Sequence, residues 1–118
     1  MPFYYYDIYE NRTGNHIGKI SIRIGDNYHS YYNGHIGYEI EEAYRGNHYS
    51  YHAAVLVLSV ARAHHMNSIY LTCKASNKAS RKIIERTHAV FKEIVKIPKD
   101  CFFWRENIED YCIYRLKL

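Results

Sequence analysis

Apolar and polar residues alternate along the first third of the chain, which is typical of strands. The clearest run is residues 19–24, where isoleucine occupies every second position and so predicts a half-buried strand. Residues 4–9 and 35–41 are predicted as strands on either side of it, because aromatic and β-branched residues are frequent there. The intervening residues 11–15 and 25–34 are polar and contain glycine, as turns and connections do. Connections this short predict that the three strands form an antiparallel meander.

Further along the chain, the apolar spacing changes to the three-and-four pattern of helices. Apolar positions within residues 53–61 predict a helix that extends to about His64. A second helix is predicted to begin after an N-cap at residues 76–77 and to carry an apolar stripe as far as Thr87. Three more strands are predicted at residues 68–74, 91–97 and 110–118.

The predicted order of elements is β-β-β-α-β-α-β-β, a mixed α/β (α+β) fold around a central sheet. The helix between the third and fourth strands is predicted to be a crossover connection. A chain of 118 residues has the length of one domain, so residues 1–118 are expected to fold as a single unit.

Charge and cysteine usage narrow the classes of function. Sixteen Lys and Arg against twelve Asp and Glu give a net charge of +4, which suits an anionic ligand but is too small to indicate a nucleic-acid binder. The cysteines, Cys73, Cys101 and Cys112, are odd in number and widely spaced, which favours reduced thiols in the cytoplasm over a disulfide framework. No apolar run approaches the roughly 20 residues of a membrane span, and the first residues lack the pattern of a secretory signal. The sequence therefore predicts a soluble, cytoplasmic protein.

The turn between the third strand and the first helix, residues 42–50, is the first candidate for chemistry. It contains Arg45 and Gly46 and leads directly into the helix. The first amides of a helix lack intrahelical partners and lie at the positive end of the helix dipole, so they can bind an anion. Arg45 adds a full positive charge, and Gly46 allows the backbone to approach a phosphate closely. The turn is a candidate phosphate site, and the alternative is a capped helix beside a solvated arginine.

The residues around this turn resemble the motif of a known family. Residues 35–50 read HIGYEIEEAYRGNHYS, which strongly resembles the acetyl-CoA-binding segment of the GNAT acyltransferase superfamily. Residues 77–86, NKASRKIIER, are similar to the second helix motif of that family and lie one predicted strand downstream, as they do in the family. The resemblance covers about residues 16–97 and implies a small acetyltransferase that uses acetyl-CoA.

The resemblance also implies a place for each part of acetyl-CoA. In GNAT proteins the third of these strands splays from the next one, and the pantetheine arm lies in the V-shaped gap. Backbone amides of the turn hold the diphosphate, and polar residues of the second helix motif contact the cofactor near its thioester. The residues that the resemblance places against acetyl-CoA are Tyr38, Glu39, Ile40, Arg45, Gly46, Asn47, His48, Tyr49, Ser50, Asn77 and Ser80.

Three departures from the family pattern bear on function. His48 and Ser50 replace the second glycine and the following small residue of the turn motif, which predicts either looser phosphate contact or, with His48 protonated, an added positive charge. Ile84 stands where many members carry a tyrosine acid, so the leaving thiolate has no obvious proton donor. The first strand and helix pair usual in the family are expected to have no counterpart before residue 4, and the sequence does not identify the acceptor.

The mechanism that the resemblance implies is direct attack of an acceptor amine on the thioester, while a strand amide polarises the carbonyl. Glu39 and Glu41 lie on the strand beside the expected cleft and are candidate bases, and the alternative is that both lie on the solvated side of a half-buried strand. Tyr111 and Tyr114 in the last strand are candidate acids, with a role in the core or at a sheet edge as the alternative. The acceptor is expected to be an amino group of a small molecule or peptide.

Other functions have less support in the sequence. His48 and His52 are spaced like helical metal ligands, but no HExxH word or CxxC pair accompanies them, so no metal site is predicted. A CoA-binding or interaction module without turnover and a nucleic-acid-binding domain remain as alternatives. Residues 4–9 form an aromatic strand at the expected edge of the sheet, which predicts a homodimer because exposed edges are normally covered.

Overall fold

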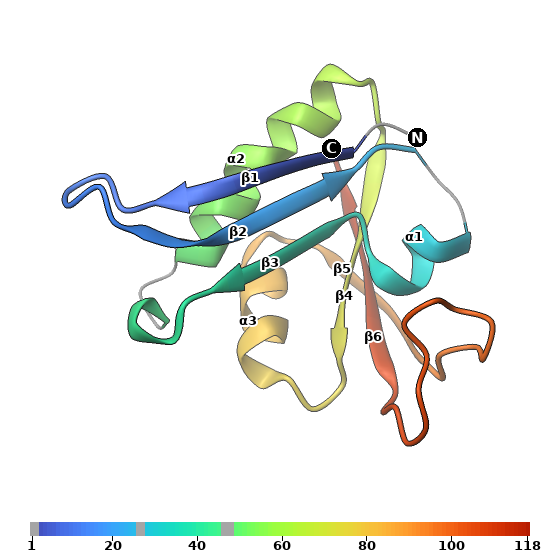
Figure 1. The fold of residues 1–118 in the computed structure, drawn as a ribbon. Helices are drawn as coiled ribbons and strands as arrows, with labels where there is room; N and C mark the ends of the chain where they lie inside the picture. The colour runs from blue at the N-terminus through green and yellow to red at the C-terminus, as the bar shows by residue number, and fades with distance from the viewer. Residues whose placement is uncertain (1–2, 26–27, 46–48) are drawn as a thin grey trace.

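Two three-stranded sheets and the helices packed on them make up the molecule (Figure 1). The computed structural model describes residues 3–25, 28–45 and 49–118. Its elements in chain order are β1 (Phe3–Tyr9), β2 (His16–Arg23), α1 (Tyr28–Asn33), β3 (Ile36–Ile40), the 3-10 turn η1 (Glu42–Tyr44), α2 (Tyr49–Ala63), β4 (Ser68–Lys74), α3 (Lys78–Arg86), β5 (Val90–Val95) and β6 (Tyr111–Lys117).

The first sheet has the strand order β1-β2-β3, and both of its strand pairs are antiparallel. In the central strand β2, Ile20 lies opposite Tyr6 on β1 and opposite Tyr38 on β3. The alternating isoleucines of β2 belong to a buried cluster with residues of α2, which covers one face of this sheet (Figure 1). The predicted antiparallel meander is confirmed.

The second sheet has the strand order β4-β6-β5, again with antiparallel pairs. Strand β6 lies in the middle, with its Cys112 opposite Cys73 on β4 and Ile94 on β5. The mixed α+β class is confirmed, with one difference: the described strands form two antiparallel sheets rather than one mixed central sheet. Local alternation identifies strands but not their partners, because pairing depends on packing between segments far apart in the chain.

The two sheets meet at the beginning of β3 and diverge toward its end (Figure 1). At the meeting point, the backbone N–H of His35 donates to the carbonyl of Tyr70 on β4 at 2.9 Å. The Tyr70 N–H donates to His35 Nδ1 at 2.8 Å, so Nε2 carries the ring proton and donates to the Gly25 carbonyl at 3.0 Å. This buried histidine fixes the closed end of a V between β3 and β4, at the place where the divergence is predicted.

Helix α1 is the element that sequence reasoning missed. Residues 25–34 are predicted as a polar connection because their tyrosines and serine make no apolar stripe. In the structure, contacts with a distant segment stabilise the helix, and Tyr28 Oη donates to Asp100 Oδ1 at 2.8 Å. Gly34 follows the helix with φ of 78°, the left-handed conformation common after a helix end. The Asn-Gly pair was therefore the available signal of a helix C-terminus.

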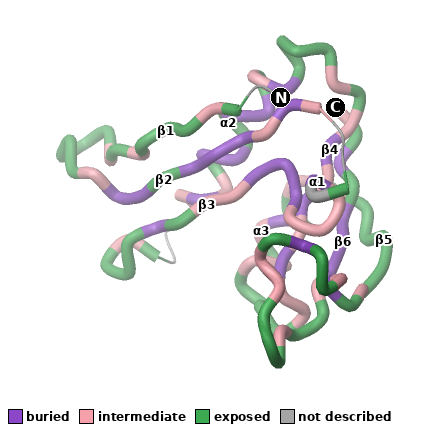
Figure 2. The backbone as a smooth tube through the Cα atoms, turned by 45° about the vertical axis from the view of Figure 1, so that its right-hand side comes forward, coloured by how far each residue is buried: buried purple, intermediate pink, exposed green. Residues whose placement is uncertain are grey.

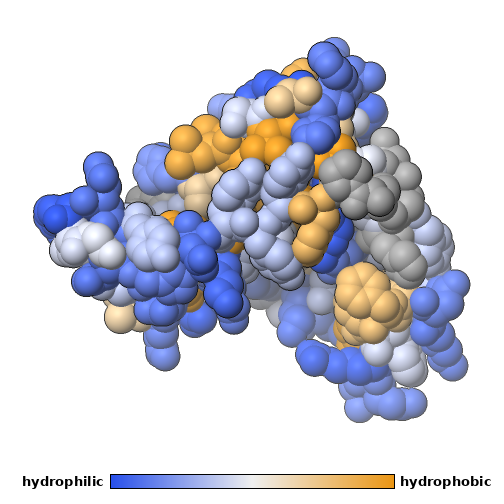
Figure 3. All heavy atoms as spheres, turned by 45° about the horizontal axis from the view of Figure 1, so that its top comes forward, coloured by the Kyte–Doolittle hydropathy of each residue, from blue (hydrophilic) through white to orange (hydrophobic). Residues whose placement is uncertain are grey.

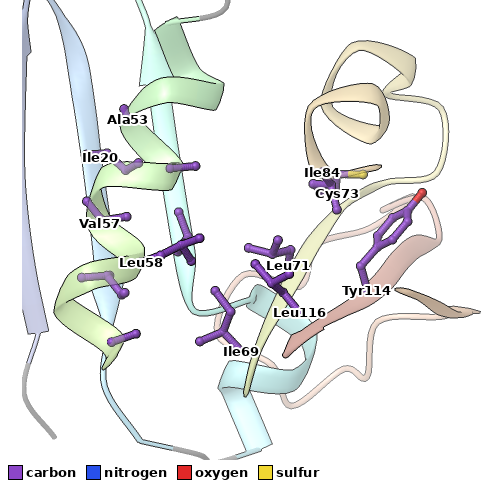
Figure 4. Packing of buried hydrophobic residues seen from close by; sticks show 14 of the residues in the cluster. Ile20, Ala53, Val57, Leu58, Ile69, Leu71, Cys73, Ile84, Tyr114 and Leu116 are labelled. Carbon is purple, nitrogen blue, oxygen red and sulfur yellow. The ribbon is translucent and has the colours of Figure 1, made fainter. Parts of the chain in front are cut away.

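One hydrophobic cluster contains residues of both sheets. Figure 4 shows side chains from α2, β4, α3 and β6 converging, with Ile84 of α3 beside Cys73 of β4. Burial is concentrated in β2, β4 and β6, whereas the outer strands β1 and β5 are mostly exposed (Figure 2). Within the ranges that the structure describes, no helix has the length and apolar character needed to cross a membrane.

Candidate active site

A cavity of about 430 Å³ opens beside the C-terminal end of β3. Its walls come from β3, η1, the first turn of α2 and the first half of α3. Two helices therefore begin at this cavity, which adds partial positive charge from their first turns. The lining residues are Tyr38, Glu39, Ile40, Tyr44, Arg45, Tyr49, Ser50, Asn77, Ala79, Ser80 and Ile83.

Every residue predicted to contact acetyl-CoA that the structure describes lies in this lining. The other predicted contacts, Gly46, Asn47 and His48, lie outside the described residues. The structure thus brings together residues from three separate segments of the chain, as the resemblance implies. Their contacts with acetyl-CoA remain predictions.

A hydrogen bond joins β3 to α3 within the cavity wall. The hydroxyls of Tyr38 and Ser80 lie 2.8 Å apart. Burial raises the pKa of Tyr38, so its hydroxyl is protonated at neutral pH. Sequence reasoning gave Tyr38 only a place beside the cofactor, because the spacing of residues along the chain does not show which side chains of different elements form a hydrogen bond.

Asn77 positions the start of α3. Its Oδ1 accepts the backbone N–H of Ser80 at 3.0 Å, so the N-cap predicted at residues 76–77 is confirmed at Asn77. An N-cap of this kind stabilises a helix by about 1 kcal/mol. The same side chain thereby fixes the backbone of Ser80 at the cavity.

Arg45 and Tyr49 flank the turn at the mouth of the cavity. Arg45 Nε donates to the carbonyl of Ile40 at 3.0 Å, which holds the guanidinium beside the end of β3. The Tyr49 hydroxyl donates to Glu10, and this hydrogen bond is the main reason that the pKa of Glu10 is lowered. The start of α2 is thus tied to the turn between β1 and β2.

A second cavity, of about 660 Å³, lies on the first sheet and shares Tyr38 and Glu39 with the first. Asp7, Lys19 and Glu39 lie in one row across its three strands. Glu39 is exposed and lies with Tyr38 at the boundary that the two cavities share. We call these the helix cavity (the first) and the sheet cavity (the second).

Glu41, the other candidate base, is placed apart from this boundary. Its carboxylate lies 3.5 Å from His16 Nδ1, and His16 Nε2 lies 3.1 Å from Asp7 Oδ1. Among the described residues, Glu41 lines neither the helix cavity nor the sheet cavity. Of the two candidate bases, Glu39 is the one that lines the cavities.

The two candidate acids on β6, Tyr111 and Tyr114, are not among the described residues that line the helix cavity. Tyr114 is 1% exposed, and its hydroxyl accepts from Arg81 Nε at 3.1 Å and donates to Glu85 at 2.9 Å. Tyr111 is half-buried, with its ring 5.5 Å from that of Phe103. Burial raises the pKa of both tyrosines. These contacts agree with the alternative to an acid, a role of both tyrosines in the core or at a sheet edge.

A cysteine nucleophile is disfavoured at this site. Burial raises the pKa of Cys73 to about 11, so its thiol is protonated at neutral pH and a poor nucleophile. In the part of the chain that the structure describes, His, Cys, Asp and Glu form no group of three or more that could hold a metal ion.

Three lining residues were not predicted as site residues from the sequence: Tyr44, Ala79 and Ile83. Ala79 and Ile83 are spaced four apart and were assigned to the apolar stripe of the second helix, where a cavity wall and a core look alike. Tyr44 directly precedes Arg45 in the motif that suggested the family, and this position was the available signal.

Comparison with known proteins identifies the family. A sequence model described as an acetyltransferase (GNAT) domain matches residues 2–90. A search of curated proteins finds no match to the sequence.

Solved structures share the fold. A GNAT-family acetyltransferase from Bacillus anthracis is 18% identical, with a TM-score of 0.76 over 96% of this chain and 65% of that chain. A Salmonella typhimurium acetyltransferase that modifies the N-terminal serine of ribosomal protein L7/L12 is 18% identical, with a TM-score of 0.66 over 89% of this chain and 59% of that one. A ribosomal L7/L12 alpha-N-protein acetyltransferase in complex with coenzyme A is 20% identical, with a TM-score of 0.67 over 89% of this chain and 57% of that one.

The chain thus spans about three-fifths of the length of these structures, and at such low identity their likeness concerns the fold. The domain match extends over β1 to the start of β5 and includes all the residues that line the helix cavity. The chain belongs to the GNAT acetyltransferase family.

Proposed function

We propose that this protein transfers an acetyl group from acetyl-CoA to an amino group of a small molecule or peptide. The observation that carries the proposal is the boundary formed by Tyr38 and Glu39, which line both the helix cavity and the sheet cavity. A cofactor in the helix cavity and an acceptor in the sheet cavity would meet at this boundary. Direct transfer requires such a meeting of the two reactants.

The residues of the helix cavity fit coenzyme A by their chemistry. Arg45 and the first turn of α2 supply positive charge for the diphosphate. Ile40 and Ile83 supply apolar surface, and the diverging end of β3 offers backbone groups to the amides of the pantetheine arm. When bound, acetyl-CoA supplies the activated acetyl group.

We assign the proton transfers to residues of this boundary. Glu39 takes a proton from the acceptor ammonium, directly or through one water, so that the amine can attack the thioester carbon. A backbone N–H of β3 polarises the carbonyl oxygen. The paired hydroxyls of Tyr38 and Ser80 give a proton to the departing sulfur, in place of the tyrosine that Ile84 replaces. The proton that the attacking nitrogen loses as the amide forms then restores this pair.

If Tyr38 gives a proton to the departing sulfur, its hydroxyl should matter for kcat but not for CoA binding. Removing its hydroxyl in Tyr38→Phe is expected to lower kcat by about 10²-fold, the lower end for a proton-transfer residue. The affinity for CoA is expected to stay within about twofold, because the ring still fills the same space. Steady-state kinetics and a CoA titration of the same preparation measure the two effects. An unchanged kcat would remove Tyr38 from the mechanism.

One observation favours a second function, a CoA-binding module without turnover. Ile84 is 4% exposed and packs in the core, so α3 presents no hydroxyl from that position. Such a module would bind CoA through the same helix cavity. It would differ from the enzyme only in the absence of transfer.

Incubation with acetyl-CoA and a panel of amines distinguishes the two functions. The panel includes small amines and a peptide with N-terminal serine, since one structural relative modifies such a terminus. Acceptor-dependent release of free thiol, with an acetylated product detected by mass spectrometry, supports the enzyme. CoA binding without thiol release above background supports the module.

We also propose that the protein lies in the cytoplasm, since all three cysteines are free thiols. We propose further that it forms a homodimer through β1. β1 is an outer strand with Asp7 as its one charged residue, and outer strands without protective charges readily pair with another strand. An apolar groove of about 600 Å³ separates β1 from α2. Figure 3 shows hydrophobic side chains gathered along this part of the surface, where α2 adjoins the first sheet.

Positively charged residues introduced on β1 are expected to prevent dimerisation through this strand. Light scattering is predicted to give a dimer mass for the wild type and a monomer mass for Tyr5→Lys/Tyr9→Lys, two positions that are 68% and 61% exposed. Lysines on the outer strand of the other sheet, in Val90→Lys/Ile94→Lys, are the matched control and should leave the dimer intact. A monomeric wild type at high micromolar concentration contradicts the proposal.

A further inference from the structure

A groove of about 780 Å³ lies at the far end of α3 from the helix cavity. We call it the cationic groove, because its walls carry Arg62, Lys92, Arg115 and Lys117. Among its described lining residues there is no Asp or Glu. The helix cavity, the sheet cavity and the groove beside β1 each include at least one carboxylate, so this excess of one sign is particular to the cationic groove.

The positive charges of the cationic groove form no ion pair within the described chain. None of its four Lys and Arg side chains lies within 4.0 Å of a described carboxylate. Lys92 Nζ lies 4.9 Å from the centre of the Tyr31 ring, and Arg115 Nε donates to Ser68 Oγ at 3.2 Å. Tyr31 and Ser68 are neutral, but the Tyr31 hydroxyl donates to the Glu93 carboxylate, so Arg62, Arg115 and Lys117 supply most of the positive charge of the groove. Cations gathered in a concave surface attract an anionic ligand.

The same groove has an apolar component. Leu58 and Leu116 are buried in its walls. Val90 and Phe91 are 69% and 46% exposed where β5 begins. A ligand that fills the groove therefore has to combine negative charge with apolar groups.

Strand β5 adds a backbone feature to this surface. It is the outer strand of the sheet β4-β6-β5 and is exposed from Val90 to Ile94. The outer side of such a strand presents backbone N–H and C=O groups with which an extended peptide can pair. A nucleic acid cannot reproduce that pairing.

The aromatic ring of the groove is poorly suited to base stacking. The centre of the Phe91 ring lies 5.5 Å from that of Tyr114 in an edge-on contact, and Arg81 lies 5.9 Å from the same ring centre. Recognition of single-stranded nucleic acids relies on accessible aromatic faces. The groove therefore favours a peptide over RNA or DNA.

From these observations we infer that the cationic groove binds an extended, acidic segment of a polypeptide, which pairs with β5 and places apolar side chains between the cations. The groove lies apart from the helix cavity, so this inference does not depend on the proposed function.

A fluorescent ten-residue peptide of alternating Glu and Val is the probe, and its fluorescence anisotropy is followed with the full chain at low salt. Arg62→Glu/Lys117→Glu reverses two exposed charges of the groove. Lys78→Glu/Lys82→Glu is the matched control, because it makes the same change of net charge on the exposed side of α3. We expect the dissociation constant to rise at least about tenfold in the groove variant and less than about threefold in the control. Thermal unfolding shows whether each variant is folded.

Two further probes test whether the groove instead binds a basic peptide or a nucleic acid. A matching peptide of Lys and Val is expected not to bind, and a ten-uridine RNA is expected to bind more weakly than the acidic peptide. Tighter binding of the RNA, lost in the groove variant, overturns the inference in favour of a nucleic acid. Equal loss in the two variants, or no binding of the acidic peptide to the wild type, overturns it outright.

Discussion

Replacing Glu39 by glutamine is expected to lower kcat for acetyl transfer by roughly 10²- to 10⁴-fold, the usual contribution of a general base. The amide has nearly the shape of the carboxylate but cannot accept the proton of the acceptor ammonium at neutral pH. The dissociation constant of CoA is expected to change by less than about threefold, because the amide keeps the size and shape of the carboxylate. The loss should shrink as the pH rises, since a larger fraction of the acceptor amine is then already deprotonated.

Glu41→Gln is the control for this prediction. Glu41 lies on the same segment but contacts His16, at 3.5 Å, and is not among the described lining residues of either cavity. Its kcat is expected to stay within about threefold of the wild type. Equal activity of the two variants would mean that Glu39 is only a solvated residue of the strand, the alternative that its alternating position allows.

The second large effect is expected from Gly18→Ala, which acts on the site through β2. Gly18 lies opposite Ile40, and a Cβ atom at this position would lie 2.2 Å from the carbonyl oxygen of Glu39 and 3.1 Å from the Cα of Ile40. Both contacts are with backbone, so β3 has to move. Overpacking of this kind costs about 1–3 kcal/mol of unfolding free energy or more, and we expect about 3. CoA affinity should fall with it, because the displaced segment lines the helix cavity.

Gly37→Ala is the matched control on the neighbouring strand. There an added Cβ would meet Ser21 Oγ at 3.3 Å, a side-chain atom that can shift, so the unfolding free energy should change by less than about 1 kcal/mol. Urea unfolding followed by circular dichroism compares the variants. A Gly18→Ala protein as stable as the wild type would show that β2 and β3 are not in the register described.

Features with local causes could be predicted from the sequence. The alternating isoleucines of β2 specify a half-buried strand wherever a core is available. The N-cap at Asn77 depends on a side chain and an amide three residues apart, and the meander depends on short connections. The motifs of residues 35–50 and 77–86 also indicated most of the described residues that gather at the helix cavity.

Features that depend on distant partners could not be predicted. Helix α1 has a weak local pattern and is stabilised by contacts such as Tyr28 with Asp100. The insertion of β6 between β4 and β5 follows from packing in the shared core. The hydrogen bond between Tyr38 and Ser80 joins different elements. The hydroxyl of the candidate acid Tyr114 forms hydrogen bonds with Arg81 and Glu85 of α3, and the strand pattern around Tyr114 does not indicate these partners.

The central claim is that the helix cavity binds coenzyme A, and calorimetric titration with CoA tests it most directly. Ala79 is exposed and lines this cavity, so Ala79→Trp should fill it, whereas Ala63→Trp places the same ring at the exposed far end of α2. The account predicts one binding site in the wild type, an affinity at least about tenfold weaker in Ala79→Trp, and an unchanged affinity in Ala63→Trp. A wild type that does not bind CoA, or an Ala79→Trp protein that binds it as tightly as the wild type, would contradict it.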